Sequence, residues 1–236
     1  MILLCVPDAA AVDNILRRDS GIAACARPGT VVIDCTTSRP ETILKLAEDF
    51  AQLRFLDAPL GRSPKEAREG QLSVMVGGAD SDLARVRPVL ETFADTILHA
   101  GPLGTGHTLK LINNIIALGY GALYSEALAL ALRAGLSPAI FDAVISSSRM
   151  DCAFFQTFMG WVRDGNADSH KFALSLAAHV MGDARGLGHN LGLDLGVVSA
   201  AARLYENAEK LGYGGANLPE LPRAIAEANG LVFPTP

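Results

Sequence analysis

The feature of this sequence that most constrains its fold is a change of character near residue 101. Before that point, short apolar runs rich in β-branched residues alternate with segments of helix-forming residues. After it, strand signals disappear, and Ala, Leu and Gly recur at helical spacing. Apolar strands separated by helices are typical of a parallel sheet that is covered on both faces. The sequence therefore predicts an α/β half followed by an all-helical half.

The same pattern predicts where the elements lie. Expected strands cover residues 2–6, 30–35, 54–58, 72–76 and 96–99, with helices at 9–17, 38–47 and 81–93. Helical periodicity then covers about 107–134, 137–148, 151–164, 172–191, 195–213 and 218–229. The run at 111–132 is apolar with Glu126 as its only charge, but asparagines, tyrosines and glycines interrupt it. We expect a helix buried at a domain or subunit interface rather than a membrane span.

Composition narrows the range of partners. Half of the 236 residues are apolar, and 20 basic residues stand against 25 acidic ones with no basic run, which argues against a nucleic-acid partner. The histidines show no metal-ligand spacing. Cys5, Cys25, Cys35 and Cys152 form neither a CxxC pair nor a dense disulfide pattern. We therefore expect a cytoplasmic protein with free, buried thiols and no metal site.

The segment Asp-Ala-Pro-Leu-Gly-Arg-Ser-Pro, residues 57–64, follows the third expected strand. Ligands of open parallel sheets bind just beyond the carboxyl ends of the strands. Backbone N–H groups from Gly61 to Ser63, the Ser63 hydroxyl and the Arg62 guanidinium would suit an anion there. Arginine can hold a carboxylate or sulfonate with two parallel hydrogen bonds. The alternative is a solvated loop arginine.

A second polar group lies in the opening turns of the long expected helix. Lys110 and Asn114 are four residues apart and share one face, with Asn113 beside them. A desolvated lysine has a lowered pKa and can transfer a proton near neutral pH. Asn114 could hold both the lysine and a substrate oxygen. The alternative is a lysine that reaches solvent and asparagines that pair with backbone.

A third candidate follows the second expected strand, in the segment 34–40. Thr37 at the tip of that strand could touch a cofactor. It could equally cap the following helix, as could Ser38, and from the residues alone capping is the stronger interpretation.

Taken together, ordered segments along nearly the whole chain resemble the β-hydroxyacid dehydrogenase family, which includes 3-hydroxyisobutyrate dehydrogenase and relatives of 6-phosphogluconate dehydrogenase. The segments are Val6-Pro7-Asp8, Asp34–Thr37, Asp57-Ala58-Pro59, Gly70-Gln71-Leu72, Met75-Val76-Gly77-Gly78, Gly104-Thr105-Gly106, Lys110–Asn114 and Ser125-Glu126-Ala127-Leu128. The resemblance implies a partial Rossmann-like, dinucleotide-binding domain over residues 1–103. An all-helical domain for substrate binding and dimerisation would cover residues 104–236.

The resemblance also implies a reaction. The family interconverts small 3-hydroxy acids and their semialdehydes with NAD or NADP. The lysine of its KxxNN motif, here Lys110, is the general acid/base, and the asparagine one turn later is Asn114. The family's cofactor contacts at the two strand ends map to Val6, Pro7 and Thr37.

The substrate loop departs from the family pattern. Most members have Ser-Gly-Gly where this chain has Gly61, Arg62 and Ser63. The Gly-Arg-Ser loop is similar to that of sulfolactaldehyde reductases, in which the arginine helps to bind a sulfonate. We therefore expect these three residues, with Asn113, to hold the acidic tail of a small anionic substrate.

The front of the chain departs as well. Nothing before residue 60 fits the glycine-rich turn that holds a dinucleotide pyrophosphate, and the sequence opens where the family's fourth strand is expected. The resemblance thus implies that the first three strands are lacking and that NAD(P) binding is weakened. We expect either a fragment or a protein that has lost the redox step, so the alternative function is a non-catalytic family member acting as a dimeric binding protein. Both alternatives predict a homodimer or higher homo-oligomer.

Overall fold

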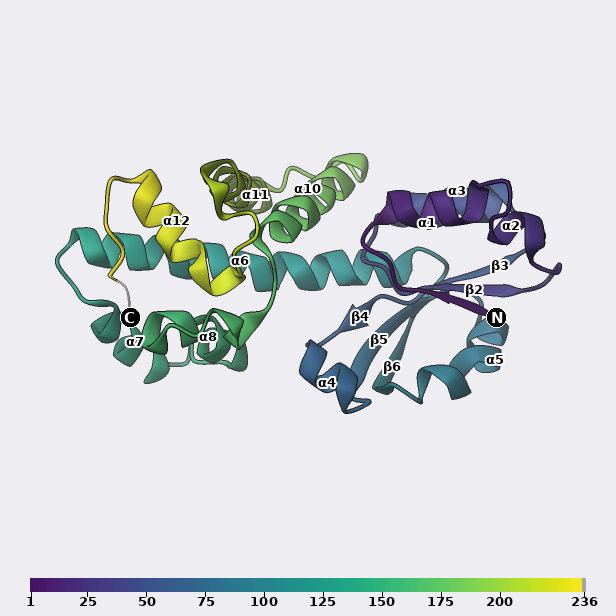
Figure 1. The fold of residues 1–236 in the computed structure, drawn as a ribbon, viewed down its shortest axis with the longest axis horizontal. Coiled ribbons are helices and arrows are strands. Elements are labelled where there is room, and N and C mark those ends of the chain that lie inside the picture. The colour runs from purple at the N-terminus through teal and green to yellow at the C-terminus, as the bar shows by residue number, and fades with distance from the viewer. Residues whose placement is uncertain (235–236) are drawn as a thin grey trace. The chain divides into compact units, whose positions relative to one another are not determined.

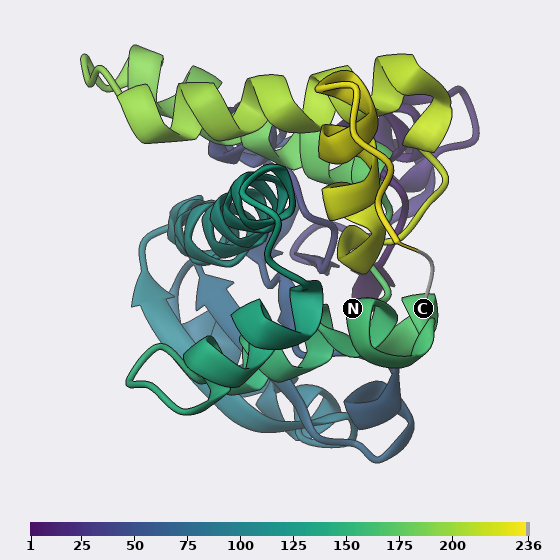
Figure 2. The same ribbon diagram turned by 90° about the vertical axis from the view of Figure 1, so that its left-hand side faces the viewer.

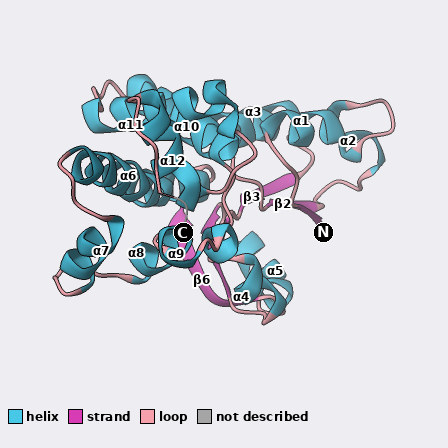
Figure 3. Cartoon of the chain, turned by 60° about the vertical axis from the view of Figure 1, so that its left-hand side comes forward, coloured by secondary structure: helices cyan, strands magenta, loops and turns pink. Residues whose placement is uncertain are grey.

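The computed structural model describes residues 1–234, and the chain forms two compact units that divide between Asn113 and Asn114. Among the described residues, all named strands lie before residue 102 and all elements after it are helical (Figure 3). The predicted order of an α/β half followed by an all-helical half is therefore confirmed.

The first unit holds one six-stranded sheet. Its strands are β1 (Ile2–Leu4), β2 (Val31–Asp34), β3 (Arg54–Asp57), β4 (Leu60–Gly61), β5 (Leu72–Gly77) and β6 (Ala94–Gly101). Its helices are α1 (Ala9–Arg17), α2 (Ile22–Cys25), α3 (Pro40–Asp49), α4 (Pro64–Arg68) and α5 (Asp80–Leu90). The five predicted strands are all present, whereas β4, α2 and α4 were not predicted.

The sheet is mostly parallel, with one reversal. The strand order is β1-β2-β3-β5-β4, and β6 pairs with β5. β1, β2 and β3 run parallel to one another, as do β5 and β6. β5 runs antiparallel to both β3 and β4. The sequence predicted the parallel pairs but not the reversal at β5.

Strand β2 illustrates why the sheet is covered on both faces. Val32 packs into a cluster with apolar residues of α1 and α3, whereas Val31 and Ile33 pack into a second cluster with residues of α5. Successive side chains of a strand point to opposite faces, so neighbours in sequence enter different clusters. Figure 1 shows α1 and α3 on one side of the strands and α5 on the other. A strand buried on both faces is apolar throughout, which explains the continuous apolar run in the sequence.

Most of the long helix α6 (Thr105–Arg133) belongs to the second unit. The other helices there are α7 (Pro138–Ser146), α8 (Ala153–Phe158), α9 (Gly160–Asp164), α10 (Leu174–Asn190), α11 (Gly196–Ala208) and α12 (Leu221–Ala228). Short helical turns cover Ala167–His170, Glu209–Tyr213 and Leu218–Glu220. α10 and α11 pack side by side (Figure 2), and the buried Tyr205 of α11 donates a hydrogen bond to the Leu118 carbonyl of α6 at 2.7 Å. Burial raises the pKa of the Tyr205 hydroxyl.

The cysteines correct one expectation. All four are free, but Cys35 alone is buried, while Cys5, Cys25 and Cys152 are exposed. The expectation of buried thiols is wrong for these three because each lies at or next to the end of a short element rather than within the core. Burial raises the pKa of the Cys35 thiol to about 12.

Candidate functional site

The carboxyl ends of β1 and β2 lie side by side at one edge of the sheet. The backbone N–H of Val6 donates to the Thr36 hydroxyl at 3.3 Å. Asp34 is buried, and its carboxylate accepts the N–H of Thr36 at 2.9 Å, which fixes the turn that leads to Thr37. Pro7 is exposed, while Val6 and Thr37 are half-buried. The three residues predicted to contact a cofactor therefore share one accessible edge.

The end of β3 holds the start of α6. Asp57 is fully buried, and its two carboxylate oxygens accept the N–H of Gly104 at 2.8 Å and of His107 at 2.7 Å. The first N–H groups of a helix have no acceptor within the helix, and its positive end favours a carboxylate. The contact is close, since a Cβ on Gly106 would lie 2.7 Å from the Asp57 carbonyl oxygen. Strand β3 therefore fixes the turn that precedes Lys110.

The His107 side chain completes a polar cluster that we call the buried junction, formed by Asp34, Asp57 and His107. The imidazole is fully buried, with Nε2 3.8 Å from Oδ2 of Asp34. Neither ring nitrogen has a hydrogen-bond partner within the described part of the chain. Burial raises the pKa of the Asp34 carboxyl, and the neighbouring imidazole opposes that rise.

Lys110 follows His107 by one turn of α6. The side chain is half-buried, and this burial lowers the pKa of its ammonium group. That direction suits a lysine which takes up and releases a proton. Asn114, four residues later and in the second unit, is buried, and among residues 1–234 its Nδ2 finds no hydrogen-bond partner. Asn113 is exposed.

Strand β4 carries the Gly61–Ser63 loop away from the strand ends. Gly61 pairs with Ser73 of β5, whereas Asp57 pairs with Gly77, four residues further along that strand. At the usual rise of a strand, this separation is about 13 Å. Among residues 1–234, no hydrogen bond or ion pair joins this loop to Lys110, so their predicted cooperation on one substrate stays a prediction.

Arg62 is already engaged within the first unit. Its φ of 74° is uncommon for a residue with a side chain. The guanidinium donates to Oδ2 of Asp95 at 2.7 Å, to the Thr96 hydroxyl at 3.3 Å and to the Gln71 carbonyl. This contact holds the pKa of the Asp95 carboxyl below its usual range. An anion would therefore have to compete with Asp95 for the guanidinium.

Ser63 also has a local role. It is the N-cap of α4: its hydroxyl oxygen accepts the N–H of Lys65 at 3.2 Å, and the hydroxyl donates to the Glu66 carboxylate. The Glu66 carboxylate in turn accepts the Ser63 N–H at 3.0 Å, which completes a capping box. This arrangement orders the loop.

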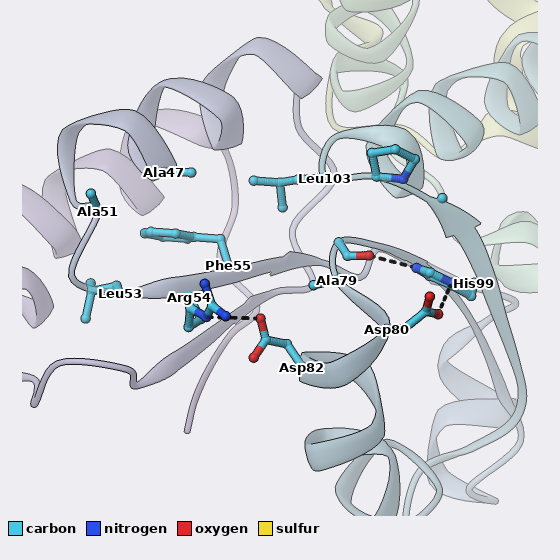
Figure 4. A pocket seen from close by; sticks show the side chains of 13 residues that line it. Ala47, Ala51, Leu53, Arg54, Phe55, Ala79, Asp80, Asp82, His99 and Leu103 are labelled. Atoms are coloured by element: carbon cyan, nitrogen blue, oxygen red, sulfur yellow. Dashed lines mark hydrogen bonds and ion pairs between the residues drawn. The ribbon is translucent and has the colours of Figure 1, made fainter.

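A hollow of about 690 Å³ lies elsewhere in the first unit, beside the start of β3 (Figure 4). Its polar side chains have partners within the hollow: the ring nitrogens of His99 face Asp80 at 3.0 Å and the Gly78 carbonyl at 2.8 Å, and Arg54 lies 3.5 Å from Asp82. None of the residues predicted from the sequence as site residues lines it. We therefore place the candidate active site at the edge formed by the strand ends and the start of α6.

Sequence reasoning missed three residues of this arrangement. Asp57 was named as part of a loop rather than as a helix cap, His107 was considered for metal binding alone, and Asp95 was not singled out. A signal existed for the first two, because an aspartate that ends an apolar strand needs buried donors and Gly104-Thr105-Gly106 offers a helix start. Asp95 gave no signal, because its pairing with Arg62 depends on the register of β4 and β5.

Comparison with known proteins shows that both halves of the chain match models of known families. Residues 1–101 match the family model described as the NAD binding domain of 6-phosphogluconate dehydrogenase. Residues 104–225 match the model described as NAD-binding of NADP-dependent 3-hydroxyisobutyrate dehydrogenase.

Individual relatives agree with both models. The chain is 33% identical to 3-hydroxyisobutyrate dehydrogenase of Pseudomonas aeruginosa, over 99% of the chain and 76% of that protein. It is 30% identical to L-threonate dehydrogenase of Escherichia coli, over 90% of the chain and 71% of the relative. A crystal structure of 3-hydroxyisobutyrate dehydrogenase from Salmonella typhimurium superposes with a TM-score of 0.82 at 26% identity, covering 94% of this chain and 78% of that one.

The fold and the matched models define an NAD(P)-dependent oxidoreductase with a Rossmann-like first half. Within that class, the chain belongs to the β-hydroxyacid dehydrogenase family and is an NAD(P)-dependent enzyme of the 3-hydroxyacid dehydrogenase type.

Proposed function

We propose that Lys110 is the general acid/base of this enzyme and that its substrate is a small 3-hydroxy acid or the corresponding semialdehyde. The observation that carries the proposal is the environment of Lys110. The lysine is half-buried with a lowered pKa, and Asp57 anchors its helix to the end of β3, the strand next to β2, after which the predicted cofactor contact Thr37 lies. In oxidation the neutral amine would take the proton from the substrate hydroxyl, and in reduction the ammonium would return it to the carbonyl oxygen.

The strand-end residues fit one part of an NAD or NADP molecule. Val6, Pro7 and Thr37 offer an accessible carboxyl edge, where parallel sheets bind nucleotides. The start of α1 is less suited to the pyrophosphate, because the Asp8 carboxylate already accepts the N–H of Ala11 there at 2.8 Å. No GxGxxG turn occurs in the printed sequence. When bound, the nicotinamide supplies or accepts a hydride, and we propose that these 236 residues bind it weakly.

Binding of the substrate's acidic tail is proposed for the Gly61–Ser63 loop, with Asn113. Arg62 supplies the charge for a carboxylate or sulfonate, and the ordered Ser63 cap supports the loop. Because Asp95 holds the guanidinium in the absence of such an anion, the substrate would replace one carboxylate by another. Asn114 would orient the reacting oxygen through the Nδ2 that otherwise lacks a partner among the described residues.

The test compares the Lys110→Ala and Lys110→Met variants with the parent chain. With 3-hydroxyisobutyrate and L-threonate as probes, we expect a fall in turnover of about 10²–10⁴-fold, which is typical of a lost general acid/base. A variant at the exposed Lys65 serves as the control. Full turnover in Lys110→Ala would refute the proposed role. If NADH and NADPH fluorescence do not change with the parent chain even at high cofactor concentration, the non-catalytic alternative is the better description of these residues.

We propose further that α6 pairs with a second copy of this chain. An apolar stripe runs along the helix, with Leu123 63% exposed and Leu130 70% exposed; its other members are Ile116 and Tyr120. These positions recur at spacings of three and four residues or their multiples, so they share a face. The helix is also long and apolar enough to cross a membrane by length and composition, with a mean hydropathy of 1.6.

Light scattering distinguishes the two explanations of the stripe. We expect a dimer for the parent chain and a monomer for a Leu123→Glu, Leu130→Glu variant, because a charge on the stripe would be buried in the dimer. A monomeric parent that floats with phosphatidylcholine vesicles would instead favour membrane contact and overturn the dimer.

A further inference from the structure

We infer that His107 is a positioning residue for Lys110, which ties the first turn of α6 to the ends of two strands at once. The inference rests on the proposed function, because it concerns the lysine that the proposal makes the acid/base. Its own test, however, does not require turnover.

The two attachments of His107 come from different parts of the residue. Its backbone N–H donates to Asp57 at the end of β3 at 2.7 Å. Its imidazole lies 3.8 Å from the carboxylate of Asp34 at the end of β2. Because the backbone hydrogen bond and the imidazole–carboxylate approach involve two different strand ends, a rotation of the first turn about the helix axis would change at least one of these distances. His107 therefore fixes the rotation of the first turn of α6 as well as its position.

The contacts continue from Asp34 to the accessible edge. Asp34 accepts the Thr36 N–H at 2.9 Å, and the Thr36 hydroxyl accepts the Val6 N–H at 3.3 Å. Two hydrogen bonds thus link the end of β1 to Asp34, whose carboxylate lies 3.8 Å from the His107 imidazole. The same groups that shape the predicted cofactor edge therefore also hold the helix of the proposed acid/base.

The geometry of the helix transmits this constraint to Lys110. Residues three apart on an α-helix lie on the same face, one turn above the other. The direction in which the Lys110 side chain leaves the helix is therefore set by the rotation that His107 fixes. A rotated helix would move the half-buried ammonium toward or away from solvent and so change its pKa.

Packing alone does not account for a histidine at this position. Both ring nitrogens are buried without a hydrogen-bond partner among residues 1–234, which is costly for a polar ring. An apolar residue of similar size would avoid that cost but would leave the Asp34 carboxylate facing apolar atoms. The contact with Asp34 is thus what the imidazole adds over a leucine.

The experiment titrates the lysines of the intact chain by NMR. The sequence contains five lysines, so protein labelled with [ε-¹³C]lysine gives a spectrum in which Lys110→Arg identifies the Lys110 signal. We expect the Lys110 midpoint to lie below those of the other lysines. In His107→Ala it should rise by about 0.5–1 pH unit, because water reaches the ammonium more easily. His107→Gln, which keeps a polar side chain toward Asp34, should restore most of the shift.

The matched control is His99→Ala, which removes another histidine of the first unit that contacts a carboxylate, Asp80, at 3.0 Å. A Lys110 midpoint that is unchanged in His107→Ala, or that moves equally in His99→Ala, overturns the inference. If His107→Ala does not fold, Asp34→Asn tests the same contact at constant volume, and an unmoved midpoint there overturns it as well. Full turnover of Lys110→Ala would refute the proposed function while leaving these titrations interpretable.

Discussion

The first unit has ionisable side chains in two contrasting places. In the buried junction, Asp34, Asp57 and His107 are almost fully removed from solvent and contact one another or backbone N–H groups. Arg62 of the Gly61–Ser63 loop, which we call the β4 loop, forms an ion pair of 2.7 Å with Asp95 of β6, but both side chains are exposed. Both places combine a carboxylate with a basic side chain, but the junction is buried and the Arg62–Asp95 pair is in contact with solvent.

Because they differ in burial, the buried junction and the Arg62–Asp95 pair are suited to different roles. A buried polar group that loses its partner pays the full cost of its lost hydration, so the junction tolerates one geometry. An exposed ion pair is screened by water and salt and contributes little to stability. The junction is thus suited to positioning Lys110, whereas the Arg62–Asp95 pair is suited to exchanging one anion for another.

The largest expected effect is a loss of stability when Asp57 of the buried junction is replaced. Asp57→Ala leaves the N–H groups of Gly104 and His107 buried without an acceptor. Each such group costs about 1–3 kcal/mol, so the free energy of unfolding should fall by about 2–6 kcal/mol. Urea denaturation followed by circular dichroism measures it. Asp95→Ala is the exposed counterpart and should leave the denaturation midpoint unchanged; equal losses in the two variants would remove the contrast.

A smaller loss of stability is expected for a substitution at Gly106, where the start of α6 packs against the buried junction. In Gly106→Ala the new Cβ would lie 2.4 Å from the Met75 carbonyl oxygen and 2.7 Å from that of Asp57, so backbone must move. We expect a loss of about 1–3 kcal/mol in the free energy of unfolding. Gly119→Ala, in the same helix with no atom within 4 Å of the added Cβ, should instead gain about 0.5–1 kcal/mol. Thermal unfolding of both variants checks the opposite signs.

The two places also differ in how far the sequence could predict them. The strands that carry the junction were predicted because short apolar runs reflect burial on both faces; the run of β2 is also rich in β-branched residues. The helix that carries Lys110 was predicted because helical spacing is local. The partner of Asp57 was not predicted, since Gly104 and His107 lie about fifty residues away and the contact is made by backbone N–H groups.

The β4 loop was the harder case. The sequence predicted the Gly61–Ser63 segment at the carboxyl edge of β3, but β4 carries it about 13 Å along β5 from the end of that strand. Its continuation along β5 depends on an antiparallel pairing of two residues, Leu60 with Val74 and Gly61 with Ser73. A strand that short has no periodicity to detect. Asp95 could therefore be identified as the partner of Arg62 only once the register of the sheet was known.

A pH experiment sharpens the comparison at Asp34. Burial raises the pKa of its carboxyl in the folded chain above the unfolded value. The folded state therefore binds the Asp34 proton more tightly than the unfolded state does. The stability that this proton contributes is fully present below the unfolded pKa, and it is lost as the pH rises through the folded pKa. We compare the free energy of unfolding of the parent with that of Asp34→Asn. The difference, parent minus variant, should fall as the pH rises from the unfolded to the folded pKa of Asp34. A difference that rises with pH would contradict burial as the dominant cause.

The smallest effect is expected at the exposed pair, and it should concern binding rather than stability. Asp95→Asn removes the carboxylate that competes for Arg62, so inhibition of the enzyme by sulfate should become about two- to fivefold tighter, in line with the strength of exposed ion pairs. Asp80→Asn, which removes the exposed partner of His99, is the matched control and should leave sulfate inhibition as in the parent. Because salt screens exposed charges, the gain should shrink as sodium chloride is raised. If Asp95→Asn binds sulfate no better at low salt, Arg62 does not exchange anions, and the loop is then as fixed as the junction.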